Sequence, residues 1–112
     1  MKFGEDQALN AFGALSQETR LQMVRALVVA GPQGLAAGLV GDRVGASPSA
    51  ASFHLAHLER AGLVQSRREA RSIIYTANYE SLSALVGFLM ENCCQGPAAE
   101  ACCSVESETQ QA

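Results

Sequence analysis

The four cysteines of the chain all lie among its last twenty residues, as two adjacent pairs, Cys93–Cys94 and Cys102–Cys103. Thiolates are the ligands that soft metal and metalloid ions prefer. Gly96–Pro97 favours a reversal of the chain, and the seven residues between Cys94 and Cys102 form a loop that costs little entropy to close. Three sulfurs can therefore meet within one subunit. We expect Cys93, Cys94 and Cys102 to bind such an ion, with Cys103 as a substitute or fourth ligand.

Other interpretations of the thiols stay open at this point. A structural zinc site usually shows Cys-x2–4-Cys spacing, which adjacent pairs lack. A redox switch would use accessible paired cysteines, and incidental thiols on a polar tail are the least specific alternative. An enzyme is not expected, because the thiols follow the C-terminal end of a helix, where the helix dipole disfavours a thiolate nucleophile. The chain also lacks a Gly-rich phosphate loop, a Ser/His/Asp arrangement and a pair of catalytic carboxylates.

The length and the N-terminal region limit the classes of protein to which the chain can belong. The 112 residues suffice for one domain with a modest core. No apolar run of about eighteen residues occurs, and the first ten residues carry two acids and lack the apolar core of a signal peptide. We therefore expect a cytoplasmic protein with no membrane partner, in which thiols stay reduced.

Charge is distributed unevenly along the chain. The net charge is −3, but residues 40–75 hold five arginines and only three acids, whereas the remainder holds three basic and eight acidic residues. The basic middle is expected to lie near phosphate, and the acidic tail to lie away from it.

Apolar periodicity predicts the helices that would position these groups. One face of a first helix is formed by Ala8, Leu9, Phe12 and Leu15. A second helix is expected to begin at an N-cap, Ser16, and to end before Gly31–Pro32. Its predicted apolar stripe is Leu21, Val24, Leu27 and Val28. Residues 34–46 predict a weaker third helix with Leu35, Leu39, Val40 and Val44 toward a core.

The next segment has the pattern of a helix-turn-helix. Ser47 is a good N-cap, Pro48 suits the first helical position, and Ala61–Gly62 ends the helix. One side of this helix is apolar, with Ala51, Leu55 and Leu58. The predicted DNA contacts lie elsewhere on it: Ser47 (mainly a cap), Ser49, Ser52, His54 and His57, the last of which is equally well explained as a solvent-facing residue.

A β-hairpin is expected to follow. The runs 63–66 and 72–76 favour strands, and the tip between them carries the three predicted phosphate contacts, Arg67, Arg68 and Arg71. Ala70 lies where such a tip can require a positive φ, which would strain this residue.

The last predicted helix, Tyr79 to Asn92, is apolar enough to need a partner, and a second subunit is the expected one. Its stripe, together with two residues of the first helix, gives the predicted dimer interface: Leu9, Phe12, Leu82, Leu85, Val86, Leu89 and Met90.

The run from Ser47 to Val64, SPSAASFHLAHLERAGLV, resembles the recognition helix and first wing strand of the ArsR/SmtB family of winged-helix repressors. Thr19–Leu21 and the segment from Arg67 to Tyr75 are similar to other parts of that family's pattern. The resemblance covers roughly residues 8–92. It implies a homodimer that binds operator DNA and releases it when an ion binds.

Two departures from the family pattern limit the kinds of ion that the protein is expected to bind. Residues 36–42 lack the Cys-x-Cys of many arsenic and cadmium sensors, and residues 79–92 lack the histidines of zinc and cobalt sensors. The segment from Glu91 to Gly96, followed by Cys102, is similar to an arsenical-repressor subgroup with three thiolates at the end of the last helix. This similarity implies As(III) or Sb(III) as inducer and no organic cofactor.

We therefore predict a mainly α fold with a small β-hairpin wing, a winged helix-turn-helix that is dimeric. Residues 1–92 would form the DNA-binding and dimerisation domain, and residues 93–112 a cysteine-bearing, metalloid-binding tail. The expected function is transcriptional repression by a homodimer on double-stranded operator DNA, relieved by trivalent arsenic or antimony. The alternative is a thiol redox-sensing repressor of the same fold.

Overall fold

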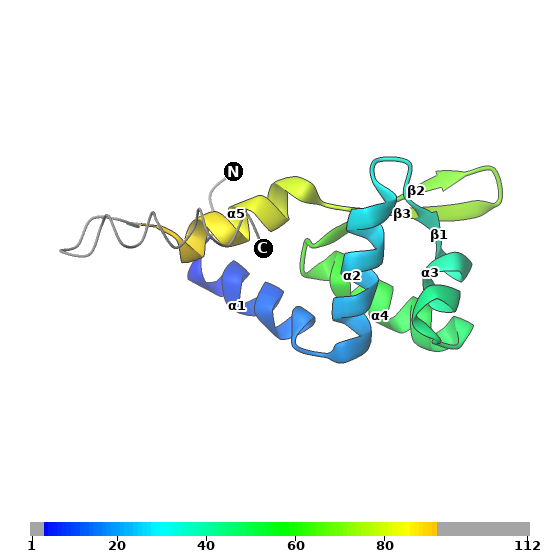
Figure 1. The fold of residues 1–112 in the computed structure, drawn as a ribbon, viewed down its shortest axis with the longest axis horizontal. Coiled ribbons are helices and arrows are strands. Elements are labelled where there is room, and N and C mark those ends of the chain that lie inside the picture. Colours follow the sequence, from blue (N-terminus) through cyan, green and yellow to red (C-terminus); the bar gives the residue numbers. More distant parts are fainter. Residues whose placement is uncertain (1–3, 92–112) are drawn as a thin grey trace.

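The computed structural model describes residues 4–91, which form helices around one small antiparallel sheet (Figure 1). The elements in chain order are α1 (Glu5–Leu15), α2 (Glu18–Ala30), β1 (Leu35–Ala36), α3 (Ala37–Val44), α4 (Pro48–Arg60), β2 (Val64–Glu69), β3 (Ser72–Ala77) and α5 (Tyr79–Leu89). This arrangement confirms the predicted mainly α fold with a hairpin wing. No helix in the described part of the chain is long and apolar enough to cross a membrane.

The core lies where α2, α3 and α4 meet the base of the sheet. Its largest fully buried side chains are Met23, Leu27, Val40, Leu55, Leu58, Leu63 and Val64. Each such side chain contributes about 1.5–3 kcal/mol by leaving water. Ala51, Leu55 and Leu58 form the buried side of α4, as the spacing predicted. The core therefore holds α4 by one side and leaves its opposite side exposed.

The first two helices bury part of the faces that were predicted, with Ala8 in α1 and Val24 and Leu27 in α2 buried as expected. Small residues of α1, namely Ala8, Ala11 and Ala14, pack on the core, so that the helices approach closely while Leu9 and Phe12 stay exposed. In α2 the buried residues are Met23, Val24 and Leu27, and the predicted Leu21 and Val28 are exposed.

The predicted N-cap of α2 was wrong by one residue. Gln17 caps this helix with its side-chain oxygen, which accepts from the Arg20 amide at 2.8 Å. Ser16 instead ends α1, where its hydroxyl donates to the Gly13 carbonyl at 2.8 Å. A glutamine side chain is long enough to fold back onto its own helix, and it replaces the shorter serine in this role.

Helices α3 and α4 form the helix-turn-helix. Gly45 takes a left-handed conformation at the end of α3, and the Ser47 side chain caps α4 by accepting from the Ala50 amide, as predicted. Gly41 faces α4, because a Cβ at this position would lie 3.0 Å from the Ala51 Cβ. Val40 is buried and Val44 packs against the core, as predicted, whereas Leu39, also expected toward the core, is exposed.

The sheet has the order β1-β3-β2, and its short first strand was not predicted. Strands β2 and β3 form the wing (residues 64–77), in register from Val64 opposite Ala77 to Glu69 opposite Ser72. The wing turn is therefore only Ala70–Arg71, and Arg67 and Arg68 belong to strand β2 rather than to the tip. Ala70 has φ 55°, the left-handed conformation that the sequence suggested.

Helix α5 begins after an Asn78 cap, which accepts from the Ser81 amide, and ends at Leu89, three residues earlier than predicted. Its first residue is tied to α2, since the Tyr79 hydroxyl donates to the Val28 carbonyl at 3.2 Å. The helix runs beside α1, at the end of the molecule away from the wing (Figure 1).

Candidate nucleic-acid interface

The exposed side of α4 combines two predicted contacts with one residue that the sequence analysis missed. Ser49 and Ser52 are exposed, as required for contact with DNA. Phe53 is 63% exposed and lies opposite the buried stripe, since two residues from Ala51 and from Leu55 correspond to about half a helical turn. The signal was present in the sequence, because a large apolar residue out of phase with the core stripe must face solvent or a partner.

His54 is held by the body of the protein rather than presented freely to a ligand. Its Nδ1 lies 3.3 Å from Nη1 of Arg20, and in the tautomer with an unprotonated Nδ1 it accepts this hydrogen bond. Nε of the same arginine donates to the Ala14 carbonyl at 2.7 Å. Arg20 thus connects the end of α1, the start of α2 and the middle of α4. It orients α4, a role that sequence reasoning did not assign.

His57 lies one turn further along α4 and is half-buried. Burial lowers the pKa of His57 from its ordinary value, and the nearby positive charges of Arg20, Arg60 and His54 lower it further. The neutral imidazole is therefore favoured, which makes His57 a weaker partner for phosphate than a protonated histidine would be.

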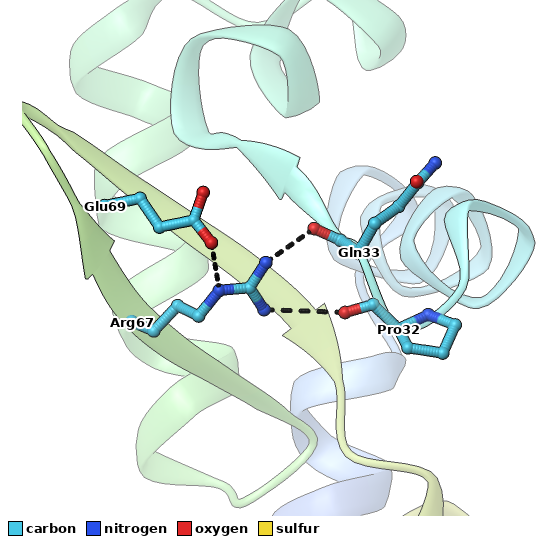
Figure 2. Close-up of polar contacts among 4 residues, drawn as sticks. All are labelled: Pro32, Gln33, Arg67 and Glu69. Atoms are coloured by element: carbon cyan, nitrogen blue, oxygen red, sulfur yellow. Dashed lines mark hydrogen bonds and ion pairs between the residues drawn. The ribbon is translucent and has the colours of Figure 1, made fainter.

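The three wing arginines fall into two groups. Among the described residues, no hydrogen bond or ion pair engages Arg68 or Arg71, and both are exposed. Arg67 instead donates to Glu69 and to the carbonyls of Pro32 and Gln33 (Figure 2). The predicted phosphate contact is therefore available at Arg68 and Arg71, whereas Arg67 is already occupied within the subunit.

The candidate interface consists of the exposed side of α4 and the wing beside it. Arg43 and Arg60 add exposed positive charge at the ends of the two helices of the helix-turn-helix. The wing extends beyond α3 and α4 (Figure 1). A helix that fits the major groove and a flanking basic hairpin make an arrangement that can bind duplex DNA.

A second candidate surface lies on α1 and α5. The side chains of Leu9, Val86 and Leu89 are 63%, 59% and 60% exposed, and Phe12 and Met90 are also exposed. Leu85, predicted as part of the same interface, is buried in the core of its own subunit, and Leu82 is half-buried against that core. We call the five exposed residues the apolar end patch.

The predicted ion ligands Cys93, Cys94, Cys102 and Cys103 lie outside the described residues. Within residues 4–91 there is no group of three or more His, Cys, Asp or Glu side chains that could hold a metal ion.

Known proteins resemble this chain over most of its length. A helix-turn-helix domain model matches residues 15–67. The transcriptional activator HlyU of Vibrio cholerae serotype O1 is 34% identical over 95 residues, which cover 85% of each protein.

Solved structures show the same arrangement of helices and wing. One is the homodimeric winged helix-turn-helix DNA-binding domain of a possible ArsR-family transcriptional regulator from Mycobacterium bovis. It has a TM-score of 0.63 and 29% identity, with 78% of this chain and 81% of that one covered. Another is a possible transcriptional regulator for arsenical resistance, with a TM-score of 0.64, 28% identity and coverage of 71% and 80%.

Proposed function

Because the chain belongs to the ArsR/HlyU family of winged helix-turn-helix transcriptional regulators, we propose that it represses transcription as a homodimer on operator DNA and that trivalent arsenic or antimony releases it. The family relatives are regulators and not enzymes, which confirms the expectation of a non-enzymatic protein. The observation that carries the proposal is the exposure of Ser49, Ser52 and Phe53 on α4 and of Arg68 and Arg71 on the wing.

The side chains of this surface suit both parts of DNA recognition. Arg68 and Arg71 supply the charge that binds phosphates and makes affinity depend on salt. The serine hydroxyls and the phenyl ring can contact base edges in the major groove. The half-buried His54, fixed by Arg20, supports the orientation of α4.

The apolar end patch supports the dimer. Its leucine, valine, phenylalanine and methionine residues are exposed on α1 and at the end of α5, two helices that contact each other, and we propose that a second copy covers them. A two-fold axis through this patch would place two α4 helices on one face of the duplex. They must lie about 34 Å apart to enter successive major grooves.

The thiol chemistry supports the inducer. Trivalent arsenic and antimony are soft ions that thiolates bind in preference to oxygen ligands, and four cysteines follow α5 in the chain. One structurally similar protein is a possible regulator for arsenical resistance. We propose Cys93, Cys94 and Cys102 as ligands, with Cys103 as the alternative.

Release of DNA would follow from the position of α5. This helix carries part of the apolar end patch and leads directly to the cysteines, so ion binding beyond its end would change how the two subunits pack. A coupling of about 1–3 kcal/mol corresponds to about a 5- to 150-fold loss of affinity for DNA.

The test is operator binding with and without arsenite. The duplex is selected by the protein from a random library, and the buffer contains a phosphine reductant, since dithiols would themselves bind arsenite. We expect arsenite to release the wild type and to leave a variant with all four Cys→Ser changes bound. The single variants C93S, C94S, C102S and C103S then identify the ligands.

The same measurements separate the competing functions. Release of the cysteine-free variant by arsenite would contradict the proposed site. Release of the wild type only by an oxidant, under conditions where arsenite has no effect, would indicate a redox switch instead. Failure to bind any duplex would contradict the DNA-binding function itself.

A further inference from the structure

We propose that Arg67 acts in DNA binding as a positioning residue, which ties the wing to the turn between α2 and β1 and so sets the angle at which the wing meets DNA. This inference rests on the proposed DNA-binding function and assigns Arg67 a role different from the phosphate contact that its charge suggests.

The contacts of the guanidinium group are the first part of the evidence. Nη2 donates to the Gln33 carbonyl at 2.9 Å, Nη1 to the Pro32 carbonyl at 3.4 Å, and Nε to a carboxylate oxygen of Glu69 at 2.8 Å (Figure 2). Every nitrogen of the group therefore already has an acceptor, and its charge is partnered by Glu69. Three of the five N–H groups are thus engaged within the subunit, and a phosphate that approached the remaining two would meet a guanidinium whose charge the Glu69 carboxylate already offsets.

The position of Arg67 in the sheet is the second part. Strand β3 lies between β1 and β2, and Arg67 on β2 is opposite Ile74 on β3. Pro32 and Gln33 precede β1, on the other side of β3. The side chain thus reaches across β3 and joins one outer strand, β2, to the turn that leads into the other, β1. Glu69, which pairs with Ser72 beside the wing turn, extends the connection toward the tip.

The turn that accepts the hydrogen bonds of Arg67 is itself packed against the sheet. Gly34 has φ 71°, and a Cβ there would collide with the Tyr75 carbonyl oxygen, so the turn lies directly against β3. An isolated two-stranded hairpin is only marginally stable. The wing beyond β1 is such a hairpin; Arg67 connects it to the turn before β1, and the Ser66 hydroxyl connects its base to Glu59 of α4 at 2.7 Å.

The experiment compares R67Q and R67K with the matched controls R68Q and R71Q. Each is titrated with the duplex selected by the wild type and with a shorter duplex trimmed to the base pairs that α4 covers, over a series of KCl concentrations. We expect R67Q to bind the long duplex about fivefold more weakly, with an unchanged salt slope and no loss on the short duplex. R67K should behave as R67Q does, because an ammonium group cannot reach all three acceptors. R68Q and R71Q should each lower the salt slope by about one.

Two results would overturn the proposal. If R67K keeps wild-type affinity while R67Q lowers the salt slope by about one, Arg67 contacts phosphate directly. If R67Q weakens binding to both duplexes equally, its effect is a general one on folding and not on the wing.

A measurement without DNA keeps this inference separate from the proposed function. Amide hydrogen exchange should be faster in R67Q than in wild type and R68Q at residues 66–74, and unchanged in α4. Equal exchange rates in all three proteins would refute the positioning role of Arg67, whether or not the protein binds a duplex. Absence of duplex binding with faster wing exchange would instead contradict the proposed function alone.

Discussion

Phe53 gives the exposed side of α4 a large apolar group at the position most distant from the core. Exposing a phenyl ring to water is unfavourable, and contact with another apolar surface offsets this. In the major groove, the apolar group that a phenyl ring can contact is the C5-methyl of thymine. The proposed DNA contact therefore includes a preference for thymine beneath Phe53.

We predict that replacing contacted thymines by deoxyuridine weakens wild-type binding about fourfold per methyl group. F53A should bind more weakly and should no longer distinguish thymine from deoxyuridine. The measurement is a set of equilibrium titrations with matched duplexes. V29A, which shortens an exposed valine of α2, should retain the wild-type preference. Equal discrimination by F53A and wild type would show that another residue contacts the methyl group.

His57 makes stability depend on pH. Its pKa is lowered in the folded protein from the ordinary 6.5, first by burial and then by Arg20, Arg60 and His54. As the pH falls through about 6.5, the unfolded chain therefore takes up a proton more readily than the folded chain, so acidification destabilises the fold. At higher pH both states are neutral and His57 makes no difference.

We expect the free energy of unfolding of the wild type to decrease from about pH 7.5 to about pH 5.5, and that of H57Q to decrease less. Urea unfolding at the two pH values measures both. Identical decreases in the two proteins would mean that His57 titrates equally in the folded and unfolded chains.

At the scale of elements, the turn before β1 depends on Gly34. Its left-handed φ and its closeness to the Tyr75 carbonyl leave no room for a Cβ. We predict that G34A destabilises the protein by about 2–5 kcal/mol, from backbone strain and overpacking. The control is G38A in α3, where a Cβ meets open space; it should be neutral or stabilise by up to about 1 kcal/mol. Thermal unfolding of both variants tests this, and similar effects would contradict the close approach.

The helix-turn-helix was predictable because its signals are local. Ser47–Pro48 fixes the start of α4, and a repeat of Ala51, Leu55 and Leu58 defines its buried side. Strand β1 was not predictable, because two residues carry no periodicity and Leu35–Ala36 becomes a strand only by pairing with Ile74 and Tyr75. The apolar face of α1 was predicted in part: Ala8 is buried and Leu15 packs against the core, whereas Leu9 and Phe12 are exposed and Ala11 and Ala14 are buried instead.

The candidate site was predicted in part for the same reason. The exposure of Ser49, Ser52, Arg68 and Arg71 follows from local position. The contacts of His54 with Arg20 and of Arg67 with Pro32 and Gln33 join residues more than thirty positions apart. Such partners depend on the tertiary fold, and no pattern along the chain indicates them.

At the scale of the whole molecule, the wing and the apolar end patch lie toward opposite ends (Figure 1). We predict that L89E, which places a charge in the apolar end patch, raises the dimer dissociation constant about 100-fold or more, because a buried unpaired charge is strongly unfavourable. Its affinity for DNA should fall as well. The matched control is V29E, at a valine of α2 that is 83% exposed, which should stay dimeric. Analytical ultracentrifugation distinguishes them, and a dimeric L89E would place the interface elsewhere.

The end of α2 and the turn that follows it accept hydrogen bonds from two other parts of the fold. The Tyr79 hydroxyl at the start of α5 holds the Val28 carbonyl, and the Arg67 guanidinium holds the carbonyls of Pro32 and Gln33 a few residues later. This segment is thus a common hinge for α5 and the wing, which the chain also joins directly through Asn78. A displacement of α5 along its axis would move this hinge through the contact of Tyr79 with Val28. The contacts of Arg67 would then tilt the wing, while α4 keeps its place on the core. Such a protein would first lose the contacts of the wing with the DNA on either side of the base pairs that α4 covers.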